Sequence, residues 1–155
     1  MDSINKSYIP FTVEFPIPTN RDELISITKK ILDTDYSPRT MEKELRYRLK
    51  LASSNRGEIL ESLKKDIERL SGQKFSHGDK RLAYNPYFYD LLLSYLPEVI
   101  HTCYWVYDDS TQKEIDALLQ NKMEEMNVSW WWSFYNPIGK KSIPEIQHKQ
   151  VYYIL

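Results

Sequence analysis

The residues of this chain that are best placed for metal chemistry are Asp108, Asp109 and Ser110. They follow an apolar run that predicts a strand over 99–107, and they precede a helical pattern over 110–126. Ligands of α/β sheets bind where strands end and helices begin, and two carboxylates there would suit Mg²⁺, which prefers oxygen ligands. The simpler interpretation is a helix N-cap, with negative charge stabilised by the helix dipole. We favour the cap, and a small Mg²⁺-dependent enzyme using Asp108 and Asp109 stays as an alternative.

A second candidate for catalysis is the pair His101 and Cys103. The two residues are two positions apart on a predicted strand, so their side chains share one face. A cysteine attacks as a thiolate, which needs a nearby base or cation. Because Val99 and Trp105 flank the pair, the pattern favours two buried packing residues over a catalytic dyad.

The segment Ser76-His77-Gly78-Asp79 places a histidine and an aspartate in a polar stretch. It matches no metal-ligand spacing, and His148 is too isolated in the sequence to complete one, so the segment predicts a turn. The chain also has no P-loop, GxGxxG, HExxH, paired CxxC or GxSxG motif. The sequence therefore favours a role without catalysis and without a cofactor.

Four cations predict a basic ridge on a helix that begins near Ser37 and Pro38, a strong start signal. At about 100° per residue their spacings place them within roughly 60° of one another. They are Arg39, Lys43, Arg46 and Lys50. The opposite, apolar side of this helix is predicted to be buried and contains Met41, Leu45 and Leu49. Such a ridge would meet phosphates or an acidic protein surface.

The charges are unevenly distributed along the chain, although the net charge is only -1. Lys and Arg outnumber Asp and Glu over residues 29–81, whereas Asp and Glu dominate residues 82–126. The molecule is therefore expected to have a basic and an acidic side. The acidic segment argues against a general affinity for phosphate groups, and nucleic acid is the less favoured partner of the ridge.

Three consecutive tryptophans, Trp130 to Trp132, lie in a predicted strand over 128–135. Alternation along a strand places Trp130 and Trp132 on one face, and Trp131 with Tyr135 on the other. We expect the first pair to belong to the core. Trp131, Tyr135 and Tyr104 are then the candidate anchors for a partner, because buried aromatic anchors dominate many interfaces. Stacking on nucleic-acid bases is the other use of such side chains.

Hydrophobic periodicity predicts an α+β fold in which a helical N-terminal half packs on a small mixed β-sheet. The sheet is expected to contain a C-terminal βαβ unit, made of strand 99–107, helix 110–126 and strand 128–135, plus a final antiparallel strand. The other expected elements are an extended arm over 9–17, helices from Asn20, from Ser37 and over 55–71, a loop over 73–84, a helix from Asn85 to Leu96, and a last strand over 150–155.

Size and composition place the chain among ordinary soluble proteins. Its 155 residues are expected to form a single domain, 1–155. The single cysteine fits a reducing cytosol. Because there is no signal-peptide pattern at the N-terminus and no apolar run of about 20 residues, we expect a cytoplasmic location and no membrane.

These observations favour a small protein-binding module as the function. An inhibitor or immunity-type protein that neutralises a toxin or enzyme would need only a rigid fold, aromatic anchors and complementary charge. Other partner-binding roles, such as an adaptor or a phage-encoded regulator, fit the same features equally well, and the partner would then be an assembly partner. The sequence identifies no family and does not name the partner.

Overall fold

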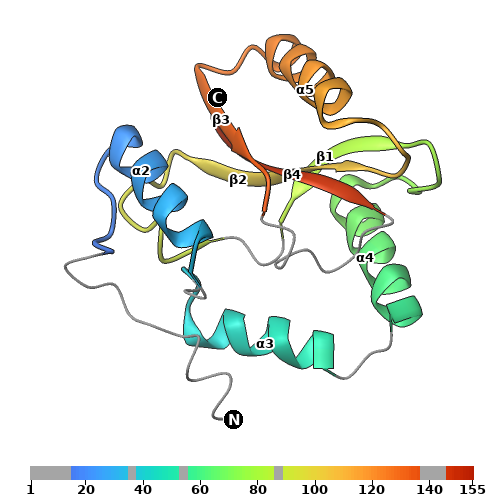
Figure 1. The fold of residues 1–155 in the computed structure, drawn as a ribbon, viewed down its shortest axis with the longest axis horizontal. Coiled ribbons are helices and arrows are strands. Elements are labelled where there is room, and N and C mark those ends of the chain that lie inside the picture. The colour runs from blue at the N-terminus through green and yellow to red at the C-terminus, as the bar shows by residue number, and fades with distance from the viewer. Residues whose placement is uncertain (1–14, 35–37, 53–55, 86–88, 137–145) are drawn as a thin grey trace. The chain divides into compact units, whose positions relative to one another are not determined.

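The computed structural model describes residues 15–34, 38–52, 56–85, 89–136 and 146–155 (Figure 1). The elements in chain order are α2 (Arg21–Leu32), α3 (Met41–Ala52), α4 (Arg56–Ser71), β1 (Lys80–Tyr84), β2 (Ile100–Val106), α5 (Gln112–Met126), β3 (Trp130–Phe134) and β4 (Gln147–Ile154). The predicted α+β class is confirmed. The arm expected over 9–17 lies mostly outside the described residues.

The chain divides into two compact units. Unit 1 consists of Met1–Asn55 and Tyr87–Val99, and unit 2 consists of Arg56–Pro86 and Ile100–Leu155. The basic and acidic segments of the sequence are each divided between the two units, so the expected basic and acidic sides stay a prediction. The single domain expected over residues 1–155 stays a prediction.

Unit 2 contains a four-stranded sheet in the order β1-β2-β4-β3, and every neighbouring pair is antiparallel. The mixed sheet expected from the sequence is therefore corrected. Strands β2 and β3 run in the same direction, as a βαβ unit requires, but β4 lies between them. Val151, Tyr152 and Tyr153 of β4 are buried on both faces, which agrees with a place inside the sheet. The expected antiparallel pairing of the last strand with the tryptophan strand is confirmed.

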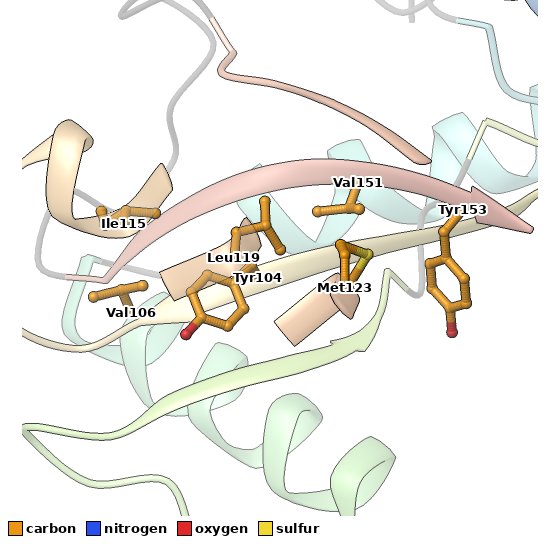
Figure 2. Packing of buried hydrophobic residues seen from close by; sticks show 7 residues of the cluster. All are labelled: Tyr104, Val106, Ile115, Leu119, Met123, Val151 and Tyr153. Carbon is orange, nitrogen blue, oxygen red and sulfur yellow. The ribbon is translucent and has the colours of Figure 1, made fainter. Parts of the chain in front are cut away.

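The two faces of this sheet are covered by different helices (Figure 1). Helix α5 covers one face through a buried cluster made of Tyr104, Val106, Ile115, Leu119, Met123, Val151 and Tyr153 (Figure 2). Helix α4 covers part of the other face through a cluster made of Ile67, Phe75, Ala83, Cys103, Trp105 and Ile146. Because side chains alternate along each strand, every residue of β2 belongs to one of these two sides.

Local signals explain the ends of α5. Thr111 is the N-cap: its side chain accepts from Glu114 N, while the Glu114 carboxylate accepts from Thr111 N, a complete capping box. The helix ends at Asn127, whose backbone is left-handed with φ 54°. Asparagine tolerates that conformation better than most residues, so the chain can turn directly into β3.

One expected helix is absent from the described part of the chain. Residues 90–95, which belong to the range predicted as a helix from Asn85, form a series of turns. Their backbone bonds are mostly of the short type, such as Ser94 N to Leu91 O and Leu96 N to Leu93 O. Pro97 limits the segment at its C-terminal end, because proline disfavours helical backbone at the preceding residue. Leu92 and Leu93 are nevertheless buried, whereas Tyr95 is exposed.

The loop expected over residues 73–84 contains a strand that the sequence did not predict. Residues Lys80–Tyr84 pair with β2 and form the edge of the sheet. A short strand with two cations and one alanine has little hydrophobic alternation, which explains the omission. The turn before it was predicted correctly: Asp79 N donates to Ser76 O, and Gly78 has a φ of 95°, which favours glycine.

Candidate partner-binding surfaces

The three aromatic residues predicted as anchors share the α5 side of the sheet. Trp131 lies opposite Tyr153 in the register of β3 and β4, and it packs, partly buried, against the cluster under α5. Tyr104 is itself a buried member of that cluster, and burial raises its pKa. Helix α5 therefore covers the face that the sequence left open for Trp131. A role of these residues in partner binding stays a prediction.

Tyr135, the third anchor, joins α5 to the sheet. Its hydroxyl donates to Asp116 Oδ1 at 2.9 Å, and Lys149 Nζ donates to the same carboxylate oxygen at 2.7 Å. The Lys149 ammonium also lies 4.7 Å from the centre of the Tyr135 ring. Burial, followed by the hydrogen bond to Asp116, raises the pKa of Tyr135. This arrangement fixes the flank of α5 that carries Asp116 beside β3 and β4.

The opposite face of the sheet contains a group of three aromatic rings, from Trp132, Phe134 and Tyr152. The ring of Trp132 lies 5.1 Å from that of Phe134 and 5.8 Å from that of Tyr152, centroid to centroid. Tyr152 is fully buried and Phe134 nearly so. These ring distances are those of packed aromatic pairs, but Trp132 itself is only partly buried. That Trp130 and Trp132 belong to the core stays a prediction.

His101 and Cys103 share one face, as predicted, and both contact Gln150. The Gln150 side-chain oxygen lies 2.6 Å from His101 Nε2, 3.2 Å from Cys103 Sγ and 3.4 Å from Asn85 Nδ2. Cys103 is only 1 % exposed. A thiol so deeply buried has no route to a substrate, so the packing interpretation holds for this pair.

The carboxylate of Asp108 is engaged within the protein. Lys80 Nζ donates to its Oδ2 at 2.7 Å, and Ser110 N donates to its Oδ1 at 2.8 Å. Gln147 donates to the backbone oxygens of Asp108 and Ser110, which fastens this turn to β4. The cap of α5 is Thr111, so the predicted cap at Asp108 to Ser110 is one residue too early. Within the described ranges, no group of three or more His, Cys, Asp or Glu residues could hold a metal ion.

The ion pair of Lys80 and Asp108 predicts an acid-dependent loss of stability. Hydrogen bonds from Lys80 and Ser110 lower the pKa of Asp108 to about 2, from 3.8. A carboxyl whose pKa falls on folding stabilises the folded state above the unfolded pKa, and this contribution is lost as the pH falls from about 4 towards 2. In urea unfolding followed by tryptophan fluorescence, Asp108→Asn should lose less stability than the wild type over that range. Asp109→Asn should follow the wild type, and an unchanged pH profile in Asp108→Asn would contradict the prediction.

The remaining histidines pack on aromatic rings. The His77 ring lies 5.5 Å from the Tyr107 ring, edge-on, and the His148 ring lies 5.0 Å from the Trp105 ring. The turn at Ser76 to Asp79 is closed by a hydrogen bond from Ser76 N to Asp79 Oδ2. The predicted turn at this segment is therefore confirmed.

In unit 1, Arg39 does not belong to an exposed ridge. Its guanidinium is 2.9 Å from the Glu44 carboxylate, and Glu44 is only 3 % exposed. The same guanidinium lies 4.8 Å from the centre of the Tyr47 ring and 5.2 Å from that of Tyr89. Arg39 precedes the first residue of α3, Met41, so helical spacing does not apply to it. The predicted ridge of four cations is corrected at this position.

The other ridge residues differ in exposure. The side chain of Arg46 is 67 % exposed and lies 3.4 Å from the Glu42 carboxylate, a weak surface pair. Lys43 is partly exposed. The side chain of Lys50 is not among those that the structure describes. Two of the predicted cations, Lys43 and Arg46, therefore remain as surface charges of α3.

The apolar stripe of α3 is exposed, contrary to the prediction that it is buried. Met41 is 38 % exposed and Leu49 is 54 % exposed, with Leu45 partly buried between them. The helix turns Glu44 and Tyr47 inward instead, and those positions lie roughly 130° from the stripe at 100° per residue. The buried ion pair with Arg39 thus takes the place that the apolar stripe was expected to occupy.

Hydrogen bonds at the N-terminus of α3 hold this helix in its orientation. Thr40 N donates to Asp90 Oδ1 at 2.9 Å, and Leu91 N donates to Pro38 O at 3.1 Å. Glu44 N donates to Thr40 O, and Lys43 N to the Thr40 hydroxyl, so Thr40 caps the helix. These bonds tie the start of α3 to the turns after Tyr89 within unit 1.

The chain has no counterpart in three comparisons: no protein-family model, curated protein or solved structure matches it. Among the described helices, none combines the length and apolar character needed to cross a membrane.

Proposed function

We propose that this protein acts by binding another protein, with the exposed side of α3 as a contact surface. The observation that carries the proposal is Leu49, which is 54 % exposed and lies two turns from the exposed Met41 on one stripe. Single exposed apolar residues are common on protein surfaces. A stripe at i, i+4 and i+8 is the pattern by which helices dock into apolar grooves of a partner.

Arg46, which lies roughly 60° from Leu49 around the helix at 100° per residue, supports a partner with an acidic rim. Arg46 extends into solvent at 67 % exposure, and Lys43 is partly exposed on the same helix. Cations at the rim of an apolar contact mainly raise the association rate and select partners of opposite charge. Exposed apolar side chains and cations occur together on α3, and we therefore favour a protein surface over nucleic acid as its partner. A contact with phosphate groups would use the cations and leave the exposed leucine without a role.

Within this proposal, the protein is an inhibitor or immunity-type protein that blocks a toxin or enzyme. The support is the same surface: a helix held rigidly at its start can enter a concave site without catalysis of its own. The inhibitory version is tested separately from binding, by titrating the purified partner with this protein. Unchanged partner activity at saturation would contradict inhibition and leave binding intact.

The binding test compares the tagged wild-type protein with Leu49→Asp as baits in an extract of the native host. We expect a specific partner, identified by mass spectrometry, to be recovered at least about tenfold less with Leu49→Asp, which corresponds to about 1.4 kcal/mol. Leu118→Asp is the matched control, because Leu118 is also an exposed leucine on a helix. Circular dichroism would show that each variant keeps its helices.

Equal recovery of the partner by Leu49→Asp and the wild type would contradict the proposal. If Arg46→Glu and Lys43→Glu together abolish binding while Leu49→Asp does not, electrostatic attraction alone carries the contact. Nucleic acid would then be the better candidate, and loss of binding with rising salt would identify it.

A further inference from the structure

Within the described part of the chain, strand β1 has an outer edge that no other strand covers. The sheet order places β1 at one end, and no strand among the described residues pairs with its outer side. Tyr107 N donates to Asp79 O at 2.9 Å, and the register of β1 and β2 places these two residues opposite each other. Inward and outward bonding alternates along an antiparallel strand. Arg81 and Ala83 therefore bond to β2, and the residues that direct N–H and C=O outward are Lys80, Leu82 and Tyr84.

The two cationic side chains of β1 could prevent another strand from pairing with this edge, but both are bound by other residues of unit 2. Edge strands usually avoid pairing through charged side chains, lysine above all. Here Lys80 is bound to Asp108 at 2.7 Å, and the Arg81 guanidinium donates to the backbone oxygens of Gln73 and Lys74. The second half of the strand carries no charge, and Tyr84 is 55 % exposed. From Leu82 onward, the outer edge of β1 therefore has no charged side chain that would oppose strand pairing.

We propose that β1 pairs with β1 of a second copy of this chain, antiparallel, about a two-fold axis at Leu82. In this register Leu82 lies opposite its symmetry mate and Lys80 lies opposite Tyr84 of the other copy. All the outward-facing residues then meet outward-facing residues, so each such pair exchanges two backbone hydrogen bonds. A two-fold interface uses the same strand on both subunits, which gives a closed dimer.

The charge pattern permits this register and disfavours the neighbouring one about Arg81, which supports a second copy as the occupant. With the axis at Leu82, each Arg81 lies opposite Ala83 of the other copy, and no two like charges are opposed. Moving the axis to Arg81 would place the two Arg81 side chains against each other, which is destabilising. The aliphatic stem of Lys80, whose ammonium stays bound to Asp108, would cover the exposed ring of Tyr84 from the other copy.

The closing experiment measures the dimer dissociation constant of the full chain by sedimentation velocity. Tyr84→Lys and Tyr84→Glu are a matched pair, because both place a charge at the same exposed position. Lysine there opposes Lys80 of the other copy and glutamate complements it, and each dimer contains the contact twice. We expect the dissociation constant of Tyr84→Lys to exceed that of Tyr84→Glu by about tenfold or more.

Amide hydrogen exchange supplies a second readout of the same pairing. The amides of Arg81 and Ala83 should be protected at every protein concentration, whereas those of Leu82 and Tyr84 should become protected only as the dimer forms. A chain that stays monomeric up to millimolar concentration would overturn the proposal. Equal dissociation constants for the two variants, or a dimer with unprotected Leu82 and Tyr84 amides, would overturn it as well.

Discussion

Replacing Arg39 by methionine is expected to lower the free energy of unfolding of unit 1 by about 3 kcal/mol. Arg39 is the ion-pair partner of Glu44 at 2.9 Å, and Glu44 is 3 % exposed. Methionine keeps much of the contact with the rings of Tyr47 and Tyr89 but leaves a buried carboxylate without this guanidinium. Removing one member of a buried pair costs far more than the pair contributes over apolar residues, because the remaining charge is desolvated.

The effect of Arg39→Met is best measured by hydrogen exchange of the α3 amides. All four tryptophans lie in unit 2, so tryptophan fluorescence would follow the other unit. The double variant Arg39→Met with Glu44→Leu should recover most of the loss, since it removes the buried charge. Arg46→Met, which alters an exposed cation of the same helix, should change stability by less than about 1 kcal/mol. Similar losses in Arg39→Met and Arg46→Met would show that Arg39 is not a buried structural cation.

Arg39 also shows where helical spacing fails as a predictor. The spacings of Arg39, Lys43 and Arg46 would define one face if all three were helical. The helix begins at Met41, so Arg39 follows a different backbone direction and reaches Glu44 instead. A start signal at Ser37 and Pro38 is local, whereas the actual start depends on Thr40 bonding to Asp90, a residue 50 positions away. Local patterns do not contain that information.

The faces of the strands could be predicted from sequence, whereas their order could not. Alternation placed Trp132 and Phe134 together, and His101 with Cys103, because side-chain direction along a strand is a local property. The order β2-β4-β3 depends on which strand is buried on both faces once all are present. The prediction considered Trp131 free to face a partner, and only the placement of α5 shows that this face is covered.

The exposed stripe of α3 is the largest difference between the expected and the observed site. Met41, Leu45 and Leu49 have the periodicity of a buried face, and no local feature distinguishes a face that packs within the chain from one that awaits a partner. The distinguishing feature is Glu44, which occupies the interior with Arg39. A glutamate is rarely buried unless it is paired. The sequence alone does not show which residue pairs with Glu44, because that depends on where Arg39 lies in the folded chain.

Replacing Leu119 by alanine is expected to lower the free energy of unfolding of unit 2 by about 3 kcal/mol. Leu119 is fully buried at the centre of the cluster under α5, between Ile115 and Met123 (Figure 2). The cost combines the lost transfer of the leucine side chain from water with the cavity that remains. Urea unfolding followed by tryptophan fluorescence measures this loss, because Trp131 packs against the same cluster.

Leu118→Ala is the matched control for the same experiment, since Leu118 is the neighbouring residue and is 37 % exposed. Its replacement should cost less than about 1 kcal/mol, because a substantial part of the side chain is already in contact with water and no closed cavity would remain. Comparable losses in the two variants would mean that α5 does not rest on the sheet through the Leu119 side. In that case the face of Trp131 would be uncovered, and Trp131, Tyr135 and Tyr104 would replace α3 as the leading partner-binding surface.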